Sequence, residues 1–184
     1  FSPKASPFIG EAICEKFRND NGLDYTPEQI LVSCGAKHSI YNVTQALVDP
    51  GDEVIFQAPY WVSYPEMVKA AGGKPVIVEA GVDQEFKLTP DQVRDAITDK
   101  TVLAILNSPS NPTGSVYTAE EMTAIVEILV ENGVTVCSDE IYERIMYDGM
   151  KHACVAALKP EFKDKTIVVN GVSKTYSMTG WRIG

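Results

Sequence analysis

Lys174 has neighbours that suggest covalent chemistry. It follows an apolar run over residues 166–170 that ends in Gly171, with Ser173 beside it and Arg182 eight positions further on. A single lysine after a strand is usually solvated. A hydroxyl and a guanidinium, however, are donors that bind phosphate, and a primary amine can condense with an aldehyde. This combination predicts a site for a phosphorylated aldehyde cofactor.

Other residues of chemical interest follow the remaining apolar runs of the chain, at Gly35, Ala36, Lys37, Trp61, Asn111, Asp139 and Tyr142. Each has an ordinary structural explanation when it is considered alone. Gly35 and Ala36 suit a tight turn, and Trp61 suits a hydrophobic core. Asn111 suits an Asn-Pro turn, and Asp139 suits a cap on the turn that follows it. Their coincidence at the ends of predicted strands favours one shared crevice.

The apolar runs alternate with segments of helical periodicity. We expect strands over residues 30–33, 53–57, 75–79, 101–106, 134–137 and 166–170, and helices over residues 11–19, 36–48, 62–71, 90–98 and 119–131. Strands that alternate with helices predict right-handed crossovers and a mainly parallel sheet with helices on both faces, a three-layer α/β/α fold. Ligands in such folds bind beyond the carboxyl ends of the strands.

Composition narrows the class of protein. A chain of 184 residues that is 45% hydrophobic can bury one sizeable core, and a net charge of -9 argues against a nucleic-acid partner. No apolar run approaches the roughly 20 residues of a membrane span, and the N-terminus lacks a signal pattern, so we expect a cytoplasmic protein.

We expect the side chains of Glu140 and Glu143 to be solvated. We also expect no metal site and reduced core thiols at Cys14, Cys34, Cys137 and Cys154.

Three ordered motifs resemble those of the class I/II, fold type I, pyridoxal-phosphate aminotransferases. They are Ser-Pro-Ser-Asn-Pro-Thr-Gly at residues 108–114, Ser-Asp-Glu-Ile-Tyr at residues 138–142, and Ser-Lys at 173–174 followed by Thr-Gly-Trp-Arg at 179–182. A fourth, Ala-Pro-Tyr-Trp-Val-Ser-Tyr-Pro-Glu-Met at residues 58–67, resembles the bacterial and plant-plastid type of aspartate and prephenate aminotransferases most closely. The resemblance covers essentially the whole chain, and it implies pyridoxal 5'-phosphate as the cofactor.

The resemblance implies catalytic roles for residues that match the family's motifs. Lys174 would bind the cofactor covalently and then move a proton at the substrate α-carbon. Asp139 would keep the ring nitrogen of the cofactor protonated. Tyr142 and Asn111 would hydrogen-bond the phenolic oxygen of the ring. Trp61 would stack on the ring face and, like Asn111, would also contact the substrate.

The resemblance also implies which residues bind the anionic groups. Ser173 and Arg182, with the backbone N–H groups of Gly35 and Ala36, would bind the cofactor phosphate. Lys37 would bind the distal carboxylate of an acidic substrate. These roles use a helix N-terminus and charged donors, which are the groups that suit anions.

The function implied is transfer of an amino group between an acidic amino acid and a 2-oxo acid, with prephenate as one candidate acceptor. Family members are homodimers with a further N-terminal segment and a C-terminal small domain, so we expect residues 1–184 to be the cofactor-binding large domain, inactive alone. One alternative is a β-lyase that uses the same lysine and aspartate. Another is the ligand-sensing domain of a transcription regulator, although residues 1–22 are not basic enough to suggest an adjoining DNA-binding segment.

Overall fold

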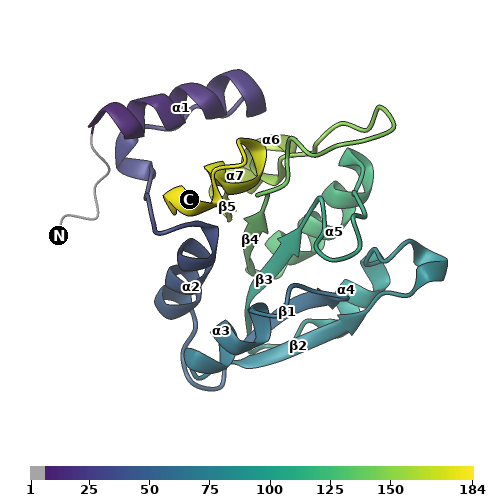
Figure 1. The fold of residues 1–184 in the computed structure, drawn as a ribbon. Coiled ribbons are helices and arrows are strands. Elements are labelled where there is room, and N and C mark those ends of the chain that lie inside the picture. Colours follow the sequence, from purple (N-terminus) through teal and green to yellow (C-terminus); the bar gives the residue numbers. More distant parts are fainter. Residues whose placement is uncertain (1–6) are drawn as a thin grey trace.

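A computed structural model describes residues 7–184, and a parallel sheet lies at its centre (Figure 1). The sheet has five strands in the order β2-β1-β3-β4-β5, and every neighbouring pair is parallel. The strands are β1 (Glu53–Ala58), β2 (Lys74–Glu79), β3 (Thr101–Asn107), β4 (Thr135–Asp139) and β5 (Thr166–Val169). The predicted parallel sheet is confirmed, and the first six residues of the expected domain lie outside the described part.

Helices cover both faces of the sheet (Figure 1). They are α1 (Pro7–Asn21), α2 (Ala36–Leu47), α3 (Tyr64–Ala70), α4 (Pro90–Ala96), α5 (Ala119–Glu131), α6 (Val155–Leu158), α7 (Pro160–Lys163) and α8 (Val172–Thr175). Short 3-10 helices occur at Pro27–Gln29, Val82–Gln84 and Thr179–Trp181. Buried residues of α2 and α3 pack on one face, and those of α4 to α7 pack on the other. The predicted three-layer α/β/α fold is therefore confirmed.

The interiors of β1 and β3, at residues 54–56 and 102–106, are apolar because both of their faces are covered. In β3, Leu103 and Ile105 pack toward α2 and α3, whereas Ala104 and Leu106 pack toward α5. Burying each large aliphatic side chain contributes about 1.5–3 kcal/mol. Burial on both faces holds the strands in place. It therefore also sets where the loops that follow their carboxyl ends begin.

The predicted strand over residues 30–33 is wrong. Leu31 is 54% exposed, and within the described residues this segment forms only an isolated bridge at Leu31 and is not one of the five strands of the sheet. Instead the Ser33 N–H donates to the Gly184 carbonyl at 2.6 Å, and the Gly184 N–H donates to the Ser33 carbonyl at 3.2 Å. The predicted helix over residues 62–71 begins later than expected, at Tyr64.

The cysteines are free thiols in the structure. Cys14, Cys137 and Cys154 are buried, as expected for core thiols. The same expectation is wrong for Cys34, which is exposed in the turn before α2. None of the helices within residues 7–184 combines the length and apolar character needed to cross a bilayer.

The N-terminus of α5 provides a test of the local forces that define a helix. The Thr118 side chain accepts a hydrogen bond from the Glu121 N–H at 3.2 Å, and the Glu121 carboxylate accepts one from the Thr118 N–H at 2.7 Å. Because this reciprocal cap satisfies two otherwise unpaired backbone donors, Thr118→Ala should lower the free energy of unfolding by about 1 kcal/mol in urea denaturation. Thr118→Ser retains the acceptor and should stay close to wild type. Identical unfolding midpoints for the two variants would contradict this role.

Candidate active site

A crevice lies where the strand order reverses. The chain passes from β1 to β2 on one side and then returns to β3 on the other, so the connections leaving β1 and β3 diverge at the carboxyl edge. A cavity of about 290 Å³ lies at this edge. It is lined by all the predicted site residues except Gly35, namely Ala36, Lys37, Trp61, Asn111, Asp139, Tyr142, Ser173, Lys174 and Arg182. The fold thus gathers residues from five separate segments of the chain at one point.

Asp139 is the buried carboxyl group of this cavity. It is the last residue of β4 and is 4% exposed. Its Oδ2 accepts a hydrogen bond from the Tyr64 hydroxyl at 2.6 Å, and its Oδ1 accepts one from the Ile141 N–H at 3.3 Å. Burial raises the pKa of Asp139 to about 6, while these two hydrogen bonds act to lower it. Both donors are neutral, so within the described residues the carboxylate has no bound cation.

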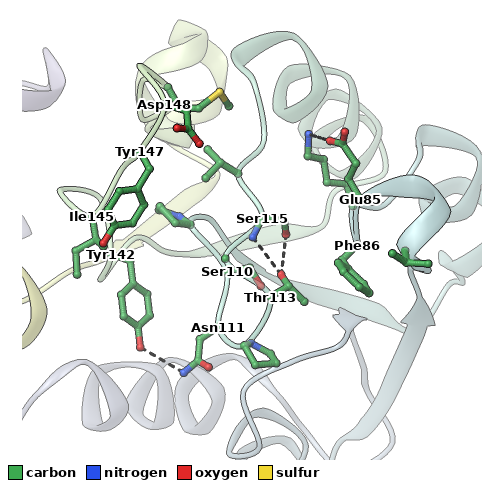
Figure 2. A pocket seen from close by; sticks show the side chains of 17 residues that line it. Glu85, Phe86, Ser110, Asn111, Thr113, Ser115, Tyr142, Ile145, Tyr147 and Asp148 are labelled. Atoms are coloured by element: carbon green, nitrogen blue, oxygen red, sulfur yellow. Dashed lines mark hydrogen bonds and ion pairs between the residues drawn. The ribbon is translucent and has the colours of Figure 1, made fainter.

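Asn107 joins two of the strands that carry the site. Its Nδ2 donates to the Asp139 carbonyl at 2.9 Å, and its Oδ1 accepts from the Asn111 N–H at 2.8 Å. The Asn111 Nδ2 then donates to the Tyr142 hydroxyl at 3.3 Å, and Figure 2 shows these two side chains meeting. A larger cavity of about 730 Å³ adjoins this pair on the side of residues 109–116 and 142–150. The amide and the phenol therefore form a wall common to both cavities.

Lys174 lies in α8, the short helix that follows β5. Gly171, at the start of this helix, packs so closely against the chain end that a Cβ there would lie 2.8 Å from the Ile183 carbonyl oxygen. The Lys174 Nζ is 5.8 Å from the centre of the Tyr142 ring, and Ser173 is buried beside it. The predicted pairing of an amine with a neighbouring hydroxyl at the crevice is therefore present.

Arg182 approaches the N-terminus of α2. Its Nη2 donates to the Cys34 carbonyl at 3.2 Å and its Nη1 donates to the Thr179 carbonyl at 3.0 Å. Gly35 precedes the helix with φ of 83°, and a Cβ at this position would lie 2.3 Å from Arg182 Nη2. The positive φ favours glycine at this position, whereas the guanidinium is the flexible end of a long side chain and can shift. The Gly35 N–H already donates to the Ser33 carbonyl at 2.8 Å.

Lys37 lies in the first turn of α2 and extends over Trp61. Its Nζ is 4.7 Å from the Trp61 ring centre, within the range of a cation–π interaction. Trp61 is half-buried and packs edge-on against Tyr64 at 5.6 Å between ring centres. The two lysines of the cavity therefore have different supports, an aromatic face for Lys37 and the α8 turn for Lys174.

Sequence reasoning assigned no role to Tyr64 or Asn107, although both lie at the site. Tyr64 is the first residue of α3 and stands three positions after Trp61, in the motif of residues 58–67. Asn107 ends the apolar run of β3, where a polar side chain is the available signal. The hydrogen bonds of both residues to Asp139 join segments far apart in sequence and could not be predicted from local patterns.

The expectation that Glu140 and Glu143 are solvated is wrong. Glu140 is 1% exposed and Glu143 is 5% exposed. Glu140 contacts His152 Nε2 at 2.7 Å, and Glu143 pairs with the Lys16 ammonium of α1. Their partners come from distant segments that enclose the turn after β4, which explains why charged residues can be buried there.

The residues present fit the cofactor that the sequence implies. Asp139 is a buried carboxylate with neutral partners, and a protonated ring nitrogen would supply the missing cation. The Arg182 guanidinium and the Ser173 hydroxyl suit a phosphate, and the Lys174 amine suits an aldehyde. A flat aromatic face at Trp61 completes a site for an anionic heterocycle.

Comparison with known proteins gives consistent matches. The family model described as aminotransferase class I and II matches residues 2–184. The chain is 55% identical over 178 residues to an aspartate aminotransferase of Geobacillus stearothermophilus, which covers 97% of this chain and 45% of that protein. It is 51% identical to an aspartate/prephenate aminotransferase of Cereibacter sphaeroides, with the same coverage. Thermus thermophilus aspartate aminotransferase with maleate aligns with a TM-score of 0.94 at 47% identity, covering 99% of this chain and 47% of that one. The chain thus spans less than half the length of these relatives.

The Tyr64 hydroxyl should control the charge of Asp139. Because this phenol donates to the charged carboxylate, Tyr64→Phe should raise the pKa of Asp139 from about 6 by roughly one pH unit, so that ionisation occurs at higher pH. Carboxyl ¹³C NMR titration of the cofactor-free protein measures this change. Tyr60→Phe is the matched control, because the Tyr60 ring packs on Phe56 and its hydroxyl does not contact Asp139. An unchanged Asp139 titration in Tyr64→Phe would exclude this role.

Proposed function

Because the chain belongs to the class I and II aminotransferases, we propose that it is the cofactor-binding large domain of an enzyme that transfers an amino group between an acidic amino acid and a 2-oxo acid. The observation that supports this most directly is the single cavity shared by Lys174, Asp139 and Arg182. An amine, a buried carboxylate and a guanidinium at one sheet edge provide a covalent attachment point, a partner for a ring nitrogen and a phosphate ligand.

Pyridoxal phosphate, when bound, supplies an electron-withdrawing ring that makes the α-proton of an amino acid acidic. In this proposal Asp139 faces the ring nitrogen and holds its proton. Lys174 Nζ, when neutral, would move a proton between the substrate α-carbon and the cofactor. The position of Lys174 next to the Tyr142 ring supports this role, since it keeps the amine inside the cavity.

The remaining side chains orient the reacting groups. The Asn111 amide and the Tyr142 hydroxyl already meet at 3.3 Å and would bind the phenolic oxygen together. Trp61 would stack on the ring. Ser173 and Arg182 would bind the phosphate, together with the Ala36 N–H at the positive end of the α2 dipole. Gly35 would contribute mainly by allowing the guanidinium to approach the helix.

Lys37 would select acidic substrates. It is a cation that lines the cavity and lies over the Trp61 ring rather than beside a carboxylate, so its charge is available to a second anion. The names of the relatives support a substrate with two carboxylates, since they include aspartate and prephenate, and one solved relative is bound to maleate. Prephenate is the finer possibility for the acceptor in this proposal.

We also propose that the chain acts within a longer polypeptide as a cytoplasmic homodimer. The relatives are about twice as long as this chain, which supports a role for further segments in full activity. The free thiols are consistent with a reducing compartment. Exposed apolar side chains at Val82, Tyr147 and Met150, around the larger cavity, are consistent with a protein contact.

Covalent attachment at Lys174 is the primary test of the proposed function. Borohydride reduction of protein loaded with pyridoxal phosphate should place the label on the peptide that contains Lys174, as found by mass spectrometry. Lys174→Ala should lose the label, while Lys37→Ala should keep it because Lys37 belongs to the same cavity without a covalent role. A label on another lysine, with Lys174 unmodified, would refute the assignment.

Substrate selection by Lys37 can be tested separately in the complete enzyme. Loss of a charge-assisted hydrogen bond costs about 1.5–3 kcal/mol, so Lys37→Ala should lower kcat/KM for aspartate roughly 10- to 150-fold. Activity with alanine, which lacks the distal carboxylate, should be spared. Equal losses for both substrates, together with weaker cofactor binding, would show that Lys37 binds the phosphate instead.

A further inference from the structure

The turn after β4 has two functional faces. Residues 141–144 form the turn, and the Glu143 N–H donates to the Glu140 carbonyl at 3.0 Å. Asp139 and Tyr142, three residues apart, line the cavity. Glu140 and Glu143, with the same spacing, are buried and do not line it. The buried carboxylates of Glu140 and Glu143 therefore belong to the same segment as the cavity-lining residues Asp139 and Tyr142, but lie outside the cavity lining.

The Glu140 carboxylate makes hydrogen bonds on both sides of the turn after β4. Its Oε1 accepts hydrogen bonds from the Ser138 hydroxyl at 2.8 Å and from the Val155 N–H at 3.1 Å. Its Oε2 contacts His152 Nε2 at 2.7 Å. Ser138 precedes Asp139 in β4, and Val155 begins α6. The Glu140 carboxylate thus connects the end of β4, through Ser138, to the start of α6, through Val155.

Glu143 makes a different attachment. It pairs with the Lys16 ammonium and accepts a hydrogen bond from Asn21 Nδ2 at 3.1 Å, and both partners belong to α1. Its charge is therefore matched by the Lys16 ammonium, whereas Glu140 is held by the Ser138 hydroxyl, the Val155 N–H and the His152 imidazole. The two acids are similar in burial and position but differ in what they hold and in how their charge is balanced.

We propose that Glu140 is a positioning residue for the cofactor, whose buried carboxylate holds Asp139 and Tyr142 in place and keeps a second negative charge beside Asp139. This inference rests on the proposed function, because the charge would favour a protonated ring nitrogen at Asp139. Burial is the main cause of the raised pKa of Asp139, and the Glu140 charge contributes in the same direction. Glu143 is not among these causes, which agrees with its pairing to Lys16.

Glu140→Gln is the informative change because the amide has the same shape without the charge. Its NH₂ group would face His152 Nε2, where a carboxylate oxygen now accepts. Transfer of the imidazole proton to Nδ1 would not solve this, since Nδ1 is buried without a partner in the described structure. The matched control is Glu143→Gln, which removes a buried carboxylate from the same turn but leaves the contacts of Glu140 intact.

Two measurements distinguish positioning from a merely structural role. In cofactor-free protein, carboxyl ¹³C NMR should show the pKa of Asp139 falling below about 6 in Glu140→Gln and unchanged in Glu143→Gln. Absorbance titration with pyridoxal phosphate should show affinity weakened about two- to tenfold in Glu140→Gln and within twofold of wild type in Glu143→Gln. Both variants should lower Tm, because both lose hydrogen bonds of a buried carboxylate.

The inference is overturned if Glu140→Gln lowers Tm but leaves the Asp139 titration and the cofactor affinity at their wild-type values, or if Glu143→Gln has the same effects. Failure of wild-type protein to bind pyridoxal phosphate would instead refute the proposed function, and the Asp139 titration would still report on Glu140. Should Glu140→Gln not fold, Glu140→Gln combined with His152→Leu removes the mismatched imidazole contact, and the same two readouts decide.

Discussion

The burial of the Asp139 carboxylate is the constraint on which the site depends. A carboxyl that titrates near pH 6 in the folded protein and near its ordinary 3.8 when unfolded stabilises the fold below the lower value. That contribution is lost as the pH rises through about 6, so ionised Asp139 destabilises the cofactor-free protein at neutral pH by roughly 3 kcal/mol. A ligand that brings a positive charge to this carboxylate offsets that destabilisation. Burial of Asp139 at the end of β4 therefore favours binding of a cationic ligand.

The surroundings of Asp139 explain how the charge is held. β4 lies between β3 and β5, so its end is fixed from both sides by backbone pairing. Asn107 binds the Asp139 carbonyl, while Tyr64 binds the carboxylate from α3. Glu140 approaches from the opposite direction and connects the strand to α6. The carboxylate cannot rotate toward solvent without breaking its hydrogen bonds to the Tyr64 hydroxyl and the Ile141 N–H.

The strand order separates the two anionic ends of the proposed reactants. Arg182 and the start of α2 lie at one end of the cavity, where backbone and guanidinium donors converge. Lys37 projects from the same helix toward Trp61, and Lys174 reaches in from the connection after β5. Three cations thus share one cavity without redundancy, because each is supported by a different element. A parallel sheet achieves this readily, since all of its carboxyl ends deliver loops to the same edge.

The sequence by itself determined the alternation of strands and helices, the cap at Thr118, and the identity of the polar residues that end each strand. These features depend on neighbours within a few residues, so they can be read locally. Only the tertiary structure decided that Glu140 is buried, that Cys34 is exposed, and that residues 30–33 are not one of the five strands of the sheet. It also decided that Tyr64 binds Asp139, a contact between residues 75 positions apart. Burial and long-range hydrogen bonding depend on which distant segments pack together, and local periodicity does not contain that information.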